Sequence, residues 1–237
     1  MTPLERAREL VASAERVAVL TGAGISAESG IPTFRGAGGL WRNFRPADLA
    51  TPEAFDRNPE LVWEWYMWRR ALIGGAQPNA GHLALAQWER RVQELTLITQ
   101  NVDGLHDRAG SRRILKIHGD IWLSRCTACS YQRLDRSAEY TGLPRCPECN
   151  ALLRPGVVWF GEPLPRLVWD AAERAVHDCQ LLAVAGTSAQ VYPAAGLIGQ
   201  SRAPVIEINV EDTLYTPAVT VALRGTCGDL LPHLLAT

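Results

Sequence analysis

Four of the six cysteines form two C-x-x-C pairs, and such pairs can bind a metal. Cys126 and Cys129 are followed, after 16 intervening residues, by Cys146 and Cys149. This spacing is typical of a tetrahedral zinc site, in which four thiolates leave no open position and the metal is structural. A redox site needs a single C-x-x-C at a helix start and does not explain two matched pairs. The sequence therefore predicts one structural zinc ion.

A glycine-rich turn near the N-terminus has the spacing of a dinucleotide-binding loop. Gly22, Gly24 and Ala27 match the G-x-G-x-x-G/A pattern directly after the apolar run Arg16–Leu20. Glycines there allow a tight turn and a close approach of the backbone to a pyrophosphate at a helix N-terminus. Glycine turns between a strand and a helix are common, so the motif alone is weak evidence. A dehydrogenase would carry an acid about 20 residues further on, but Phe44–Phe55 is broken by prolines. Hydride transfer is therefore not the obvious use of the dinucleotide.

Polar residues follow two of the expected strands. Asn101 and Asp103 come after Leu95–Thr99, and His118 ends the run Ile114–Ile117. Ligands bind at the carboxyl ends of strands in doubly wound folds, so His118 is placed where an imidazole could act as a base. Taken alone, the histidine is better explained as a strand-end residue satisfied by hydrogen bonds, and Asn101 to Asp103 could be a simple turn.

The elements that must position these residues alternate between strands and helices. Apolar runs suited to buried parallel strands are Arg16–Leu20, Leu95–Thr99, Ile114–Ile117, Leu181–Ala185, Pro204–Ile208 and Ala218–Leu223. Helix-compatible segments are Pro3–Ala14, Pro52–Ile73, Gly81–Arg91, Pro165–Val176, Pro193–Ser201 and Asp229–Leu235. This alternation predicts an α/β fold with a doubly wound, parallel, Rossmann-like sheet.

Two stretches break the alternation and are interpreted as insertions. Residues 36–79 would form a helical module, and residues 120–155 would form the four-cysteine zinc ribbon. Together they are expected to make a smaller second domain. Residues 1–35, 80–119 and 156–237 would make up the Rossmann-like NAD-binding domain.

Composition narrows the partners and the location. The chain has 237 residues, with 24 basic and 25 acidic side chains and a formal net charge of −1. Such a balance gives no electrostatic footprint for nucleic acid or for an anionic membrane. No apolar stretch is long enough to span a bilayer, and the N-terminal segment lacks the apolar core of a signal peptide. A cytoplasmic location is therefore expected.

Four blocks, in order along the chain, resemble one known family. They are Gly22–Ser26 with Gly30–Arg35, then Thr99–His106, then His118–Gly119, then Gly186–Ser188. This ordered set looks like the signature of the sirtuins, the silent-information-regulator family of NAD⁺-dependent protein deacylases. The resemblance covers nearly the whole chain, and sirtuins carry a zinc ribbon at the corresponding place.

The resemblance implies a role for each matching residue. NAD⁺ would be consumed as a co-substrate, His118 would be the general base, and Asn101 would orient ribose and water. The residues expected to contact NAD⁺ are Gly22, Ala23, Gly24, Ser26, Ala27, Thr33, Phe34, Arg35, Trp41, Gln100, Asn101, Val102, Asp103, Gly186, Thr187, Ser188, Asn209, Val210, Glu211 and Cys227. The implied reaction releases nicotinamide and transfers the acyl group from lysine to give O-acyl-ADP-ribose.

One helical segment resembles a determinant of acyl specificity. Tyr66 and Arg69 are three residues apart and share a helix face, where a hydroxyl and a guanidinium could bind a carboxylate. The pair is similar to the Y-x-x-R motif of class III sirtuins, which remove succinyl, malonyl and glutaryl groups. Without the family, an amphipathic helix with a packed aromatic stripe is the better explanation. With it, desuccinylase and demalonylase activity beside deacetylase activity is expected.

The protein substrate is expected to bind as an added strand. The family segment that pairs with the substrate backbone resembles the run from Val157 to Glu162, in which Val158, Phe160, Gly161 and Glu162 are the expected contacts. Three alternatives stay open: deacetylation alone, mono-ADP-ribosylation of a protein side chain, and a non-enzymatic NAD sensor. Retention of the expected base His118 argues against the last two.

Overall fold

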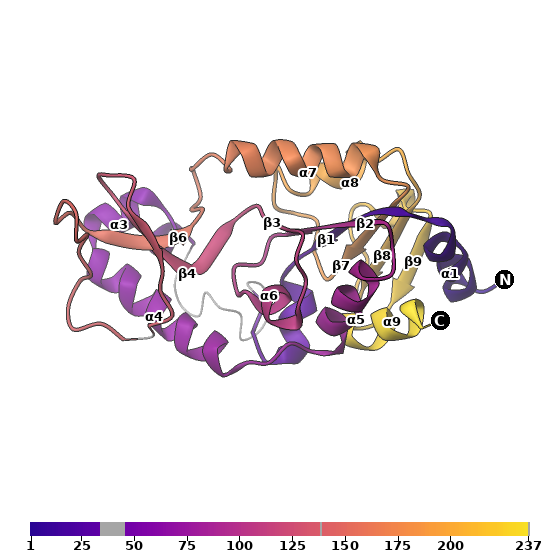
Figure 1. Cartoon of the computed structure of the whole chain (residues 1–237), viewed down its shortest axis with the longest axis horizontal. Coiled ribbons are helices and arrows are strands. Elements are labelled where there is room, and N and C mark those ends of the chain that lie inside the picture. Colours follow the sequence, from indigo (N-terminus) through magenta and orange to yellow (C-terminus); the bar gives the residue numbers. More distant parts are fainter. Residues whose placement is uncertain (34–45, 138, 237) are drawn as a thin grey trace.

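The computed structural model describes residues 1–33, 46–137 and 139–236. Three residues expected to contact NAD⁺, Phe34, Arg35 and Trp41, lie outside this part of the chain. Figure 1 shows an elongated molecule whose large lobe contains a parallel sheet between helices. A smaller lobe, at the left of the view, contains the helices and strands of the two expected insertions.

Six parallel strands form the large sheet, and all six correspond to expected runs. Their order is β3 (Ile114–Lys116), β2 (Glu94–Thr99), β1 (Arg16–Thr21), β7 (Leu181–Ala185), β8 (Val205–Asn209) and β9 (Val221–Arg224). The chain thus winds outward from β1 in both directions, which is the doubly wound arrangement with its switch point beside β1. The last strand starts later than expected because Ala218 belongs to the short helix η2 (Thr216–Ala218).

Helices cover both faces of this sheet (Figure 1). On one face lie α1 (Pro3–Ser13), α5 (Ala80–Glu89) and α9 (Cys227–Leu235), and on the other α7 (Arg166–Asp178) and α8 (Gly196–Gln200). Val17 and Val19 of β1 pack into the first layer, whereas Ala18 and Leu20 pack into the second. Burial on both faces explains why this strand is apolar throughout instead of alternating.

The predicted bounds of two helices were wrong. The segment Pro52–Ile73 is not one helix but two, α3 (Pro52–Arg57) and α4 (Pro59–Gly75). Asn58 leaves helical geometry (φ −152°, ψ 79°), and its side chain accepts a bond of 3.1 Å from the N–H of Leu61. Pro59 then occupies the first position of α4, where a missing N–H has no intrahelical partner to lose. The helix expected over 193–201 is reduced to the five residues of α8, because the residues before it form turns.

The smaller lobe is built around one shared hydrophobic core. Here α4, with α3 and the short α2 (Pro46–Leu49), packs against an antiparallel sheet in the order β5 (Gln132–Leu134), β4 (Gly119–Cys126), β6 (Leu153–Val157). Trp63 and Tyr66 of α4 join Trp122 and Leu153 of the sheet in this core. The helical module and the ribbon therefore stabilise one another, although the domain boundaries remain a prediction.

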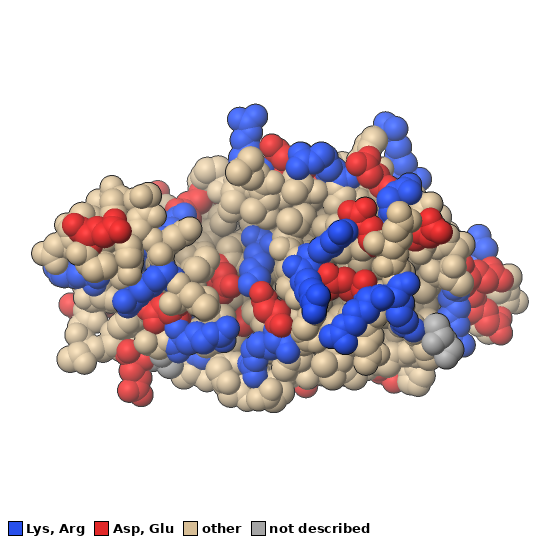
Figure 2. Space-filling model, in the orientation of Figure 1, with Lys and Arg blue, Asp and Glu red and all other residues tan. Residues whose placement is uncertain are grey.

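The surface carries both signs of charge. On the face shown in Figure 2, basic and acidic side chains are interspersed over both lobes. Among the helices in the described part of the chain, none is long and apolar enough to cross a membrane.

Candidate active site

Two glycine loops interlock at the carboxyl ends of β1 and β7. The N–H of Gly22 donates to the carbonyl of Ala185 (3.1 Å), and that of Gly24 donates to the carbonyl of Gly186 (2.7 Å). A Cβ added to Gly24 would lie 2.8 Å from the Cα of Gly186, and one on Gly22 would lie 2.7 Å from the Cβ of Thr187. The glycines of the motif are therefore required by the contact between the loops. The chain then enters a 3₁₀ helix, η1 (Ala23–Ser29).

The side chains after β2 are held by these loops. Both hydrogens of the Asn101 amide are engaged, by the carbonyl of Gly22 (3.0 Å) and by the hydroxyl of Ser26 (3.2 Å). The amide nitrogen of Gln100 donates to the hydroxyl of Thr187 (3.0 Å). Asn101 is thereby oriented so that its carbonyl oxygen is the atom it can present to a ligand, as an acceptor.

Asp103 lies at the start of helix α6 (Leu105–Ala109) and accepts two hydrogen bonds. Its carboxylate accepts from the hydroxyl of Ser26 (2.8 Å) and from the N–H of Leu105 (2.8 Å). Burial raises the pKa of Asp103, while these two bonds and the charge of Arg69 act in the opposite direction. Asp103 therefore lies between the nucleotide loops and helix α4, where Arg69 originates.

A pair of neutral histidines fills the space behind this cluster. The rings of His82 and His106 lie 4.8 Å apart, and their Nε2 atoms face the hydroxyls of Ser26 (3.4 Å) and Thr21 (3.1 Å). Burial lowers the pKa of His82 to about 4 and also lowers that of His106. His82 accepts from the N–H of Asn79 at the start of α5, so it caps this helix and packs beneath the site.

His118 lies where the parallel sheet passes into the ribbon. Its Nδ1 is 3.1 Å from the carbonyl of Gln100, and its own carbonyl accepts from the N–H of Val158 (2.9 Å). Because a carbonyl can only accept, Nδ1 carries the proton and Nε2 keeps a lone pair. Burial lowers the pKa of His118, and the bond to Gln100 only partly opposes this. The ring is therefore neutral near pH 7 and can take up a proton at Nε2.

Several of the residues expected to contact NAD⁺ lie at the carboxyl ends of β7, β8 and β9. The side-chain amide of Asn209 donates to the carbonyl of Thr187 (3.1 Å), which joins the ends of β7 and β8. Ser188, Val210 and Glu211 are exposed beside it. Cys227 is buried at the first position of α9, and burial raises the pKa of its thiol to about 12. It therefore remains a thiol, so only its backbone is suited to contact a nucleotide.

The four cysteines of the two C-x-x-C pairs converge. The sulfur atoms of Cys126, Cys129, Cys146 and Cys149 all lie within 4.8 Å of one another. Tetrahedral zinc with Zn–S bonds of about 2.3 Å would separate its sulfurs by about 3.8 Å, so the group fits one ion. The N–H groups of Ala128 and Cys129 point at the sulfur of Cys126 (3.3 and 3.4 Å), which favours a thiolate there. The site could hold one structural zinc ion between β4 and β6.

Tyr66 and Arg69 lie on the face of α4 that points toward Asp103. Both are buried, with 2% and 4% of their surface exposed. The guanidinium of Arg69 lies 4.7 Å from the ring of Trp65 and 5.5 Å from that of Tyr66. Burial lowers the pKa of Arg69, whereas the charge of Asp103 and a hydrogen bond with Tyr66 support its protonated form. A buried cation and a tyrosine hydroxyl are thus placed next to the nucleotide loops.

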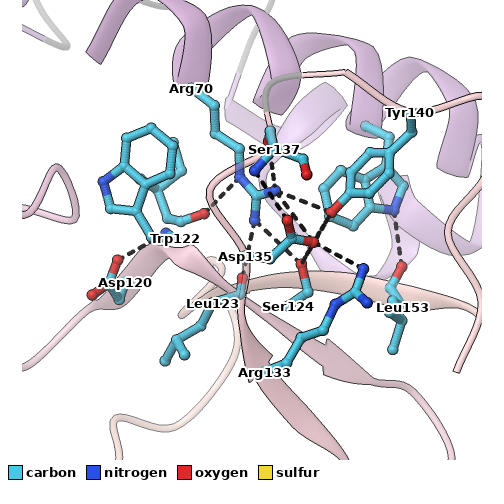
Figure 3. Close-up of polar contacts among 12 residues, drawn as sticks. Arg70, Asp120, Trp122, Leu123, Ser124, Arg133, Asp135, Ser137, Tyr140 and Leu153 are labelled. Carbon is cyan, nitrogen blue, oxygen red and sulfur yellow. Dashed lines mark hydrogen bonds and ion pairs between the residues drawn. The ribbon is translucent and has the colours of Figure 1, made fainter. Parts of the chain in front are cut away.

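The next residue, Arg70, fixes α4 to the ribbon (Figure 3). Its guanidinium donates to the carbonyls of Ile121 (2.8 Å), Leu123 (3.3 Å) and Ser137 (3.1 Å) and to the hydroxyls of Ser124 (3.2 Å) and Tyr140 (3.2 Å). Asp135 lies 3.9 Å from Arg70 and accepts from Tyr140 and Ser124. We call Arg70, Ser124, Asp135 and Tyr140 the anchor cluster.

The expected peptide-binding segment continues from β6. The N–H of Phe160 donates to the carbonyl of Ala50 (2.9 Å), and Phe160 itself is 51% exposed. The carboxylate of Glu162 accepts from Arg154, Arg125 and the N–H of Trp159, so this side chain is committed inside the protein. Any contact of Glu162 with a peptide would therefore come from its backbone.

Comparison with known proteins identifies the family. The sequence model described as the Sir2 family matches residues 22–193, which is more than half of the chain. This chain belongs to the Sir2 family. A relative from Pyrobaculum aerophilum, named NAD-dependent protein deacylase 2, is 51% identical over 231 residues, which are 96% of this chain and 92% of that protein.

Two solved Sir2 structures resemble the chain over almost its full length. A Sir2 homologue in complex with NAD has a TM-score of 0.93 at 48% identity, with 98% of this chain and 92% of that one covered. Another, bound to a myristoylated histone peptide, has a TM-score of 0.81 at 34% identity, with 98% and 94% covered. The resemblance to sirtuins and the Rossmann-like fold with a smaller cysteine-rich module are thereby confirmed.

The Sir2 fold brings the four sequence blocks into one site. Hydrogen bonds link Gly24 to Gly186, Asn101 to Gly22, and Gln100 to both Thr187 and His118. These contacts connect segments from the ends of β1, β2, β3 and β7. The role of each side chain toward NAD⁺ remains a prediction.

One residue at the site was not singled out from the sequence. Trp159 lies between two expected peptide contacts, Val158 and Phe160, and is only 3% exposed. Successive side chains of an extended segment point to opposite sides, and here exposure alternates from Val157 to Phe160. The residues from Val157 to Phe160 are all apolar, so the sequence alone does not indicate that Trp159 points inward, toward α4.

Proposed function

We propose that this Sir2 protein is an NAD⁺-dependent protein-lysine deacylase that accepts acyl groups ending in a carboxylate, succinyl and malonyl, as well as acetyl. The coarser part of this proposal is supported by its Pyrobaculum aerophilum relative, which is named an NAD-dependent protein deacylase. The finer part rests on one observation, the buried Tyr66 and Arg69 side by side on α4 and next to Asp103.

The proposed base is His118. NAD⁺, when bound, supplies the ribose carbon that accepts the acyl oxygen and the ribose hydroxyl that is deprotonated. His118 would take this proton at Nε2, since Nδ1 is held by the carbonyl of Gln100. The lowered pKa of His118 keeps this atom unprotonated at neutral pH. Asn101, with both amide hydrogens engaged, would accept a hydrogen bond from ribose or water.

The proposed acyl pocket favours an anion for electrostatic reasons. Arg69 is a buried cation, and a carboxylate that reaches it would form charge-assisted hydrogen bonds with it. Arginine binds carboxylates through two parallel N–H groups, and a tyrosine hydroxyl adds a third donor. An acetyl group would leave these donors to water. The pocket would thus add affinity for succinyl and malonyl without excluding acetyl.

The protein substrate would bind along the segment from Val158 to Gly161. One Sir2 structure holds a myristoylated histone peptide, which supports an acyl-lysine peptide as the partner class. The N–H groups of Val158 and Phe160 are already used inside the protein. An extended peptide would therefore pair with carbonyls of this segment and with the exposed Gly161.

The proposal is tested by mass spectrometry of matched peptides that carry acetyl-lysine or succinyl-lysine, incubated with and without NAD⁺. We expect NAD⁺-dependent loss of both groups, with nicotinamide and O-acyl-ADP-ribose formed. Loss of acetyl alone would contradict the carboxylate pocket. Turnover of neither, together with ADP-ribose attached to protein, would indicate an ADP-ribosyltransferase instead.

The role of the base is tested by His118→Ala. General acid–base catalysis typically contributes about 10²- to 10⁴-fold, so kcat/KM for both peptides should fall by this factor. NAD⁺ binding, measured by calorimetry, should remain. His177→Ala is the matched control because that histidine is exposed on α7, and it should turn over normally. Normal turnover by His118→Ala would show that His118 is not the general base.

A further inference from the structure

The hydroxyl of Tyr66 is held by a tryptophan from the peptide-binding segment. The indole N–H of Trp159 donates to the oxygen of Tyr66 at 2.9 Å, and both residues are buried. An indole N–H can only donate, so the tyrosine oxygen must accept this bond. The single hydrogen of the Tyr66 hydroxyl must therefore point away from Trp159.

Trp159 is itself fixed by a group of interactions on its other side. The guanidinium of Arg154 lies 3.3 Å from the centre of its ring, and Phe55 packs at a ring distance of 5.3 Å. Glu162 accepts from the N–H of Trp159 (2.8 Å) and also binds Arg154 (3.0 Å). These contacts fix the ring plane and so the direction of its N–H.

We propose that Trp159 is a positioning residue for acyl specificity: it occupies the acceptor side of the Tyr66 hydroxyl and leaves its proton to be donated to the carboxylate of the acyl group. This inference rests on the proposed recognition of carboxylate acyl groups and adds the residue that sets the polarity of the pocket. A hydroxyl free to rotate could instead present its lone pairs, which would repel a carboxylate.

The surroundings of Tyr66 agree with a donating hydroxyl. Burial raises the pKa of Tyr66, against the smaller effects of Arg69 and Trp159, so the hydroxyl stays protonated at neutral pH. Arg69, on the same helix face, has only N–H groups and can only donate, and its hydrogen bond with Tyr66 places a second donor on the tyrosine oxygen. With Trp159 in place, the two side chains therefore present hydrogen-bond donors alone.

The test is Trp159→Phe, which keeps an aromatic ring and removes the N–H. We expect kcat/KM for a succinyl-lysine peptide to fall about 3- to 10-fold, the effect of one neutral hydrogen bond. The fall should result from a higher KM with kcat unchanged, because the carboxylate is bound equally well in the ground state and in the transition state. Because an acetyl group has no carboxylate, the ratio of succinyl to acetyl turnover should fall by the same factor.

Trp63→Phe is the matched control. Trp63 is also buried in the smaller lobe, and its N–H donates to the carbonyl of Leu153 (2.8 Å), away from Tyr66. Trp63→Phe should lower the melting temperature about as much as Trp159→Phe does. It should leave the ratio of succinyl to acetyl turnover unchanged. In a Tyr66→Phe background, adding Trp159→Phe should not change this ratio further, because the hydroxyl to be oriented is gone.

Equal losses for both substrates in Trp159→Phe would overturn the inference while leaving the proposed function intact. Failure of the wild-type protein to remove succinyl would instead overturn both. Should Trp159→Phe not fold, the indole ¹⁵N–¹H signal of Trp159 in wild-type protein provides a second test. This signal should shift on Tyr66→Phe, and an unchanged signal would exclude the hydrogen bond.

Discussion

Two adjacent arginines on α4 have very different surroundings. Arg69 and Arg70 are both buried, at 4% and 0% exposure. Arg70 donates to three carbonyls and two hydroxyls of the ribbon, and Asp135 lies beside it. Arg69 instead lies against the rings of Trp65 and Tyr66 and within the electrostatic influence of Asp103.

The difference lies in what the surrounding structure supplies. The anchor cluster gives Arg70 a complete set of acceptors from backbone and side chains, so its charge is compensated within the fold (Figure 3). The face around Arg69 is mainly aromatic and lies next to the nucleotide loops. We infer that the anchor cluster holds α4 rigidly, so that Tyr66 and Arg69 keep a fixed place beside the reaction site.

Arg70→Met should have the largest effect on stability. Removing one partner of a buried charged network leaves the other uncompensated and costs about 3–5 kcal/mol. The free energy of unfolding, measured by urea titration with zinc present, should fall by this amount. The ratio of succinyl to acetyl turnover should be kept in the fraction that folds. If Arg70→Met were stable but had an altered ratio of succinyl to acetyl turnover, Arg70 would act in recognition and not in stability.

Arg69→Met should affect recognition more than stability. Loss of a hydrogen bond to a charged group costs about 1.5–3 kcal/mol, so kcat/KM for succinyl-lysine should fall about 10- to 150-fold. Turnover of acetyl-lysine should change little, since that group has no carboxylate. Steady-state kinetics on matched peptides measure both. A parallel fall for the two substrates would mean that Arg69 only supports the helix.

Lowering the pH should destabilise the folded protein through Asp135 of the anchor cluster. Burial by itself would raise the pKa of Asp135, but bonds from Tyr140 and Ser137 and the charge of Arg70 outweigh it and lower the pKa to about 2. The folded state therefore binds this proton less readily than the unfolded chain, whose aspartate pKa is about 3.9. The contribution of Asp135 is fully present above pH ~4 and is lost as the pH falls toward about 2.

Urea unfolding of wild-type protein and Asp135→Asn at several pH values measures this contribution. The stability gap between them should narrow as the pH falls from about 5 toward about 2.5. Other acid-sensitive groups, including the cysteines, are present in both proteins and cancel in the difference. A gap that is independent of pH would show that Asp135 is not ionised within the anchor cluster.

Much of the nucleotide site could be predicted because its residues follow strands directly. The apolar runs placed β1, β2, β3 and β7, and parallel strands bring their carboxyl ends to one edge. Gln100, Asn101 and His118 therefore come together with the glycine loops. The spacing of the cysteines likewise predicted a cluster that the structure contains.

The smaller lobe was less predictable, because its contacts depend on tertiary packing. The spacing from Tyr66 singled out Arg69, but nothing in the local pattern gave Arg70 a role, because only the path of the ribbon brings it to Asp135. The break at Asn58 was missed although Asn58 precedes Pro59, and a residue before proline is biased away from helical geometry. Trp159 is 93 residues from Tyr66 in the sequence, so no local pattern pairs the two.

The most direct measurement is a competition assay in which acetyl-lysine and succinyl-lysine peptides are present together at equal concentration with NAD⁺. Wild-type protein, Arg69→Met and Arg70→Met would be compared by the ratio of the two deacylated products. The account predicts that Arg69→Met shifts the ratio strongly toward acetyl, whereas Arg70→Met lowers both products and keeps the wild-type ratio. An unchanged ratio in Arg69→Met, or a shifted one in Arg70→Met, would contradict it.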